Sequence, residues 1–138
     1  MCIRDSLGGT WPPFIDETPS PGAVITFKPI IEHLFNDAPS SLQQELAKTH
    51  VPTSANVFKT GVQPPLWADE GIEGRRVWLL ATLDQTFPPE TARMFLGGSE
   101  VEWEVVEREM GHCGVVTQPG VVAQVVIGMV ERWTEERL

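Results

Sequence analysis

The pattern of apolar and polar positions is clearest in the second half of the chain. Residues 77–83 form a short continuous apolar run, which is typical of a parallel strand buried on both faces. The next stretch begins with Pro88-Pro89 and ends at Gly97-Gly98. Proline suits the first turn of a helix and glycine its end, so this stretch is predicted to be a helix through about Leu96.

The pattern then repeats. Val101, Trp103 and Val105 alternate with glutamates, which predicts a second strand with one wet face. Pro119 begins a second helix, and its apolar residues form one stripe as far as Trp133. An order of strand, helix, strand, helix predicts an α/β fold in which parallel strands are joined by right-handed crossovers.

The first half of the chain is less regular. Residues 7–26 are rich in proline and glycine and are predicted to be mostly loop, and residues 52–66 show the same punctuation. Residues 24–35 are apolar but mixed in period, so both strand and helix fit them. Residues 39–47 predict a helix, in which Ser40 and Gln43 have the spacing of a capping box.

Composition excludes several classes of function. The 138 residues are 41% hydrophobic and carry a formal net charge of −9, which argues against binding to nucleic acid or to anionic membranes. No apolar stretch approaches the roughly 20 residues that span a bilayer, and residues 1–20 lack the apolar core of a signal peptide. Two cysteines, Cys2 and Cys113, make no disulfide framework, so a reducing, cytoplasmic setting is expected.

The first six residues, Met-Cys-Ile-Arg-Asp-Ser, resemble a translated sequencing-adapter remnant. We therefore expect residues 1–6 to be non-native and the natural protein to extend further upstream. The alternative is a native N-terminus without regular structure.

Asp84 and His112 are the candidate chemical pair. Asp84 follows directly on the first predicted strand, and His112 follows the second, after a glycine that eases a sharp turn. Neighbouring parallel strands lie about 4.8 Å apart, so the two side chains would emerge at the same edge of the sheet, where open α/β folds bind ligands. A carboxylate there could accept Nδ1–H of the imidazole and leave Nε2 to take a proton from a nucleophile.

These segments resemble the α/β-hydrolase superfamily. Asp84-Gln85-Thr86-Phe87-Pro88 is similar to the segment that carries its acid, and Met110-Gly111-His112-Cys113 with Thr117-Gln118-Pro119 is similar to its histidine loop and last helix. Phe35-Asn36-Asp37-Ala38-Pro39 resembles the cap of the AB hydrolase-1 subgroup that includes methylesterases and hydroxynitrile lyases. The resemblance covers about residues 23–133.

The resemblance implies the C-terminal part of an α/β-hydrolase fold. Residues 1–22 would be a loop-rich N-terminal segment, 23–66 part of the cap, and 67–138 the C-terminal part of the core. The parent would be a serine hydrolase that cleaves a small-molecule ester or amide, with Asp84 as acid and His112 as base, and without cofactor or metal. No G-x-S-x-G motif occurs in the chain, so the fragment alone is expected to be inactive. The sequence leaves substrate identity and oligomeric state open.

Other interpretations of these residues stay open. Asp84 could merely cap the helix at Pro88, and His112 could be a loop histidine bonded to backbone. The parent could also be a hydrolase-fold binding or interaction protein that has lost its chemistry, or a lyase of the same fold.

Several further residues have a structural interpretation. His33 and His50 lie in no ligand-spaced motif and are expected to be ordinary cap residues. Cys113 is not expected to bind a metal with His112, because adjacent residues in an extended segment face opposite sides. It is not expected to be a nucleophile either, because its position does not match the nucleophile elbow. Aromatic and methionine side chains are more often core than substrate contacts, which applies to Trp67, Phe87 and Met94.

Overall fold

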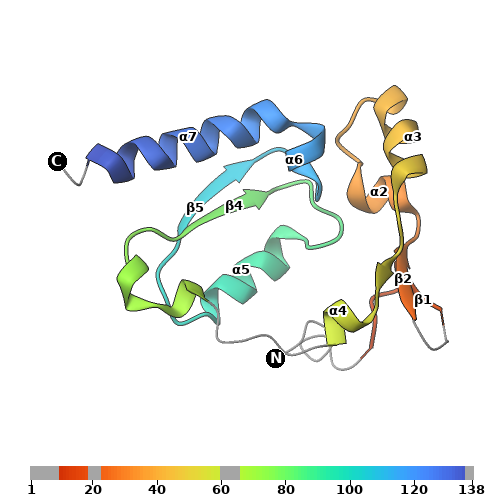
Figure 1. Ribbon diagram of the computed structural model, residues 1–138, viewed down its shortest axis with the longest axis horizontal. Coiled ribbons are helices and arrows are strands. Elements are labelled where there is room, and N and C mark those ends of the chain that lie inside the picture. The colour runs from red at the N-terminus through yellow and green to blue at the C-terminus, as the bar shows by residue number, and fades with distance from the viewer. Residues whose placement is uncertain (1–9, 19–22, 60–65, 136–138) are drawn as a thin grey trace.

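The computed structural model describes residues 10–18, 23–59 and 66–135. The expectations for residues 1–6 and for Cys2 therefore lie outside the described residues. Two small sheets organise these ranges, a three-stranded antiparallel sheet in the first half and a two-stranded parallel sheet in the second (Figure 1).

The described residues of the first half form the antiparallel sheet and three helices. The sheet has the order β1-β2-β3, with β2 in the middle. Its strands and the helices beside them are β1 (Ile15–Glu17), β2 (Val24–Phe27), α2 (Ile30–Leu34), α3 (Ser40–Thr49), β3 (Thr53–Ser54) and α4 (Asn56–Lys59).

The ambiguous stretch at residues 24–35 contains both a strand and a helix, β2 and α2, and this accounts for its mixed period. β1 lies in a region predicted to be loop; its three residues are too few to show a period of their own, and pairing with β2 defines it. Leu34, Phe35 and Ala38 form a buried cluster against which Leu42, Leu46 and Cys113 pack.

The helix predicted at residues 39–47 is confirmed as α3, but its capping box is not. Pro39 is the N-cap residue and Ser40 already lies inside the helix. Gln43 uses its side-chain amide to donate to the backbone oxygen of Phe35 at 3.0 Å, so it ties α3 to the end of α2 instead of closing a box.

The second half is the predicted strand–helix–strand–helix unit. Two short 3₁₀ turns, η1 (Leu66–Ala68) and η2 (Glu70–Ile72), precede β4 (Val77–Ala81), α5 (Pro89–Gly97), β5 (Glu104–Arg108), α6 (Gly114–Thr117) and α7 (Pro119–Glu135). β4 and β5 are parallel, in register from Val77 opposite Glu104 to Ala81 opposite Arg108. The sheet lies between α5 and α7 (Figure 1), and ion pairs from β5 reach both helices: Glu107 to Arg93 of α5, and Glu104 to Arg132 of α7.

The second strand begins later than its sequence pattern predicts. Trp103 precedes β5, where its indole N–H donates to the hydroxyl of Ser99 at 2.9 Å and its ring packs edge-on against Trp78. The apolar alternation at 101–105 therefore reflects packing at the strand entrance as well as strand pairing.

None of the helices within the described ranges combines the length and the hydropathy that crossing a bilayer requires.

Candidate active site

The loops that follow β4 and β5 run side by side at one edge of the sheet. Backbone pairing continues past both strands, because the N–H of Thr82 donates to the oxygen of Arg108 at 2.9 Å and that of Leu83 to the oxygen of Met110 at 3.0 Å. Each loop keeps its position relative to the other for two more residues. This brings the carboxylate of Asp84 within hydrogen-bonding distance of His112.

Asp84 is buried, with 8% of its surface exposed, and both of its carboxylate oxygens are used. Oδ1 accepts the backbone N–H groups of Thr86 and Phe87, each at 2.8 Å, which fixes the turn before α5. Oδ2 lies 2.9 Å from Nδ1 of His112. Asp84 can therefore stabilise the turn through Oδ1 and orient His112 through Oδ2 at the same time, so the structural and the chemical interpretations are compatible.

His112 stands at the rim of the site, with about a third of its side chain exposed. Since a carboxylate can only accept, the neutral ring carries its proton on Nδ1 and presents a lone pair at Nε2. Within the described residues no hydrogen bond reaches Nε2. An imidazole held in this way can take up a proton at Nε2, while the carboxylate stabilises the positive charge that results.

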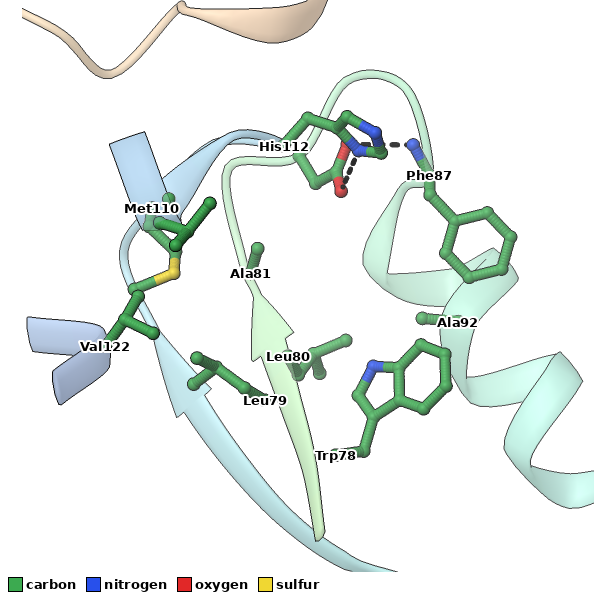
Figure 2. A pocket seen from close by; sticks show the side chains of 12 residues that line it. Trp78, Leu79, Leu80, Ala81, Phe87, Ala92, Met110, His112 and Val122 are labelled. Carbon is green, nitrogen blue, oxygen red and sulfur yellow. Dashed lines mark hydrogen bonds and ion pairs between the residues drawn. The ribbon is translucent and has the colours of Figure 1, made fainter. Parts of the chain in front are cut away.

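A hollow of about 410 Å³ opens below this pair. Four consecutive residues of β4, from Trp78 to Ala81, line it. Figure 2 shows Trp78 on the side of Ala92 and Phe87, and Leu79 on the side of Met110 and Val122. Successive strand residues face opposite sides of a sheet, so a hollow lined by all four residues reaches both faces of β4. It therefore extends around the edge of β4 that is not paired with β5. It is an open strand edge with apolar walls rather than an enclosed cavity.

The aromatic residues near the site mostly pack on one another. Phe87 lies 6.4 Å from Trp78 between ring centroids, and Trp67 lies 6.4 Å from Trp103. Met94, expected in the core, is 73% exposed on the outer face of α5, so that expectation is wrong. The helical period places Met94 on the side of α5 that turns away from β4.

The remaining histidines lie near the site without joining the pair. His33 stacks on Phe14, with ring centroids 4.3 Å apart, and its Nδ1 lies 3.4 Å from the backbone oxygen of Gln85. His50 packs edge-on against Phe27. Both side chains thus have packing partners in the first half of the chain.

The thiol of Cys113 is poorly suited to nucleophilic attack. Burial raises its pKa above the ordinary value, and the negative charges of Asp84 and Asp37 raise it further. A cysteine nucleophile reacts as the thiolate, which this environment disfavours.

Sequence reasoning missed the residues that hold the two loops from outside. Asn36 and Asp37 lie between the buried side chains of Phe35 and Ala38, and both reach the site loops. The hydroxyl of Thr86 also donates to the backbone oxygen of His33 at 2.8 Å. A polar pair embedded in an apolar segment was the available signal, since such groups are retained where they find buried partners.

Comparison with known proteins identifies the fold. No protein-family model matches the chain, and no curated protein matches it in sequence. Among solved structures, polyneuridine aldehyde esterase matches with a TM-score of 0.68 and 17% sequence identity over 94% of this chain. A histidine-to-alanine mutant of the same esterase matches with a TM-score of 0.66 and 16% identity.

The chain spans 56% of the length of each of these two structures. The match includes the antiparallel sheet as well as the β4–α5–β5–α7 unit, because it extends over almost the whole chain. The sequence resemblance is thus confirmed at the level of the fold: the chain has the fold of the C-terminal part of an α/β-hydrolase.

Proposed function

We propose that this chain is part of a serine hydrolase that cleaves a small-molecule ester, and that it supplies the acid, Asp84, and the base, His112. The observation that carries the proposal is the 2.9 Å contact between Nδ1 of His112 and Oδ2 of Asp84 at the carboxyl ends of two parallel strands. The fold shared with an esterase supports the same reading.

The chemistry would run through an acyl-enzyme. Nε2 of His112 takes the proton of a serine hydroxyl as the oxygen attacks the ester carbonyl, and Asp84 stabilises the imidazolium. His112 then passes that proton to the departing alkoxide as the carbon–oxygen bond breaks. In the second half, His112 deprotonates a water that attacks the acyl group, and the serine recovers its proton.

The nucleophile must come from elsewhere. No G-x-S-x-G motif occurs in the 138 residues. Ser99, at the end of α5, donates to the backbone oxygen of Leu96 and accepts from Trp103, so it serves the turn. We therefore place the serine and its oxyanion hole in a preceding part of the parent protein, and expect no hydrolysis by these 138 residues alone.

The lack of a G-x-S-x-G motif also favours an alternative function, that of a binding protein. A hydrolase-fold protein that has lost its nucleophile would keep the pair and the cap as a ligand-binding or interaction surface. A lyase of this fold would keep the nucleophile but change the reaction. The upstream part of the parent distinguishes these possibilities at the turn between a strand and a helix that would carry the nucleophile. A serine there indicates an enzyme, and another residue indicates a binding protein.

The expected setting follows from composition. We propose a cytoplasmic protein with a small-molecule substrate rather than a nucleic acid or membrane partner, because the net charge is −9 and cysteines are few.

The test is active-site labelling of the full-length parent, recovered from its complete reading frame. A fluorophosphonate probe should label a serine of the native protein, and Asp84→Ala and His112→Ala should each lower the labelling rate by about 10³-fold or more. Asp69→Ala and His50→Ala are matched controls outside the pair and should label like wild type. Labelling at the wild-type rate in folded Asp84→Ala or His112→Ala would contradict the assignment.

A further inference from the structure

The loop between α2 and α3 binds both site loops through two adjacent side chains. Nδ2 of Asn36 donates to the backbone oxygen of Leu83 at 2.8 Å, immediately before Asp84. The next residue, Asp37, turns to the loop that carries His112 instead. One dipeptide between α2 and α3 therefore contacts the two loops that carry the proposed pair.

Asp37 joins the two ends of the His112 loop. Its Oδ2 accepts from the hydroxyl of Thr117 at 2.8 Å and from the side-chain amide of Gln118 at 2.9 Å. The same amide nitrogen of Gln118 also donates to the backbone oxygen of Glu109 at 2.9 Å. The Gln118 amide thus joins Glu109, which precedes His112, to the end of the loop, and the Asp37 carboxylate holds that amide together with Thr117.

The other oxygen of Asp37 faces the backbone of the loop itself. A Cβ atom on Gly111 would lie 2.8 Å from Oδ1 of Asp37, so the loop lies in direct contact with the carboxylate. Burial alone would raise the pKa of Asp37. Hydrogen bonds from the Gly111 backbone and from Thr117 and Gln118 outweigh it and hold the pKa below the ordinary value. At neutral pH Asp37 is therefore a charged acceptor surrounded by donors.

We propose that Asp37 is a positioning residue, which holds the loop of His112 so that Nδ1 stays on Asp84. The proposal rests on the proposed function, because it takes His112 as the base. Hydrogen bonds to a charged acceptor are about twice as strong as neutral ones, and Oδ2 of Asp37 accepts two of them, from Thr117 and Gln118. Their loss would let the imidazole leave Oδ2, and a displacement of about 1 Å can lower a rate on the order of 10²-fold.

The sharpest test is Asp37→Asn in the 138-residue chain. Asparagine keeps the shape of aspartate but removes its charge, and if its oxygen still accepts from Thr117 and Gln118, its NH₂ group must take the place of Oδ1 beside Gly111. Long-range ¹H–¹⁵N spectra of histidine-labelled chain report which ring nitrogen carries the proton, and His112→Gln assigns the signals. We expect a single Nδ1–H tautomer in the wild type. In Asp37→Asn both tautomers should be present, with about tenfold faster exchange of the Nδ1 proton.

Asp69→Asn is the matched control. Its carboxylate also accepts a backbone N–H, that of Gly71 at 2.8 Å, but at η2 rather than at the site. This variant should leave the His112 signals unchanged. If Asp37→Asn does not fold, Thr117→Val removes one donor while the carboxylate stays charged, and it should speed the exchange about threefold.

The outcomes separate the two proposals. The positioning role would be overturned if the His112 signals were unchanged in folded Asp37→Asn, even if the stability of the chain fell. If Asp37→Asn does not fold, unchanged signals in folded Thr117→Val would overturn it. The proposed function would instead be contradicted if Nδ1 of His112 carried no proton in the wild-type chain. It would also be contradicted if the Asp84→Asn substitution left the tautomer of His112 unaltered. Neither measurement needs the upstream nucleophile.

Discussion

Gly111 and Asn36 approach so closely that a Cβ atom on Gly111 would lie 2.1 Å from Oδ1 of Asn36. Real Cβ atoms essentially never come within 3.0 Å of such a neighbour. Of the glycines described, only Gly74 has a positive φ, so space rather than backbone conformation calls for glycine at position 111. The loop before His112 can lie this close to the α2–α3 loop only because no side chain separates them.

Gly111→Ala should destabilise the chain and disturb the site together. Insertion of a methyl group into this contact forces Asn36 and Asp37 aside, at a cost of about 1–3 kcal/mol in the free energy of unfolding. Urea unfolding measures it. Gly128→Ala in α7 is the control, since nothing lies within 4 Å of a Cβ there, and alanine should stabilise that helix by about 0.5–1 kcal/mol. Equal stability of the two variants would show that the close contact does not exist.

Asp84→Asn should keep the turn before α5 but prevent His112 from acting as a base. The asparagine Oδ1 can still accept from Thr86 and Phe87, so its NH₂ group must face Nδ1 of His112. The ring then has to place its proton on Nε2, where it can no longer accept one. In the parent, the rate of fluorophosphonate labelling should fall on the order of 10⁴-fold with little change in melting temperature. A fall of less than about tenfold would show that the carboxylate does not orient the imidazole.

Much of the second half was predictable because its signals are local and agree with one another. The apolar run at β4, the proline at the start of α5 and the glycines at its end each predict an element that the structure contains. The parallel pairing of β4 and β5 then follows from the order of strand, helix and strand. The start of β5 was misplaced because Trp103 uses its apolar ring for packing ahead of the strand, which alternation alone cannot distinguish from a strand position.

The supporting contacts of the site were not predictable. Asp84 and His112 follow strands whose parallel pairing could be inferred, so their approach was expected. Asp37 meets Thr117 and Gln118 from 80 and 81 residues away, through the loop that joins α2 and α3. Hydropathy patterns carry no information on which distant loop will supply donors to a polar residue.

Asp37 should make stability depend on acidic pH. Burial raises the pKa of Asp37, but hydrogen bonding to its carboxylate outweighs burial, so the pKa in the folded chain is lower than the ordinary value of 3.8. The stabilisation by the carboxylate is therefore fully present above that value and is lost as the pH falls through the lower, folded pKa. The unfolding free energies of wild type and Asp37→Asn should differ most at neutral pH and approach each other as the pH falls below the ordinary value of 3.8. A difference that is constant over this range would show that the carboxylate titrates alike in the folded and unfolded chain.

Cys113 should react slowly with alkylating reagents as long as the chain is folded. Burial raises the pKa of its thiol, and the carboxylates of Asp84 and Asp37 add to that rise, so little thiolate exists at neutral pH. Peptide-level mass spectrometry after iodoacetamide treatment should show Cys113 modified more slowly in native buffer than in urea. Because Asp37→Asn removes one of the two nearby negative charges, the native reaction in that variant should speed up, whereas Asp69→Asn should leave it as it is. A Cys113 that is alkylated faster in the native chain than in urea would mean that the site favours the thiolate, and a thiol nucleophile beside His112 would then have to replace the missing serine in the mechanism.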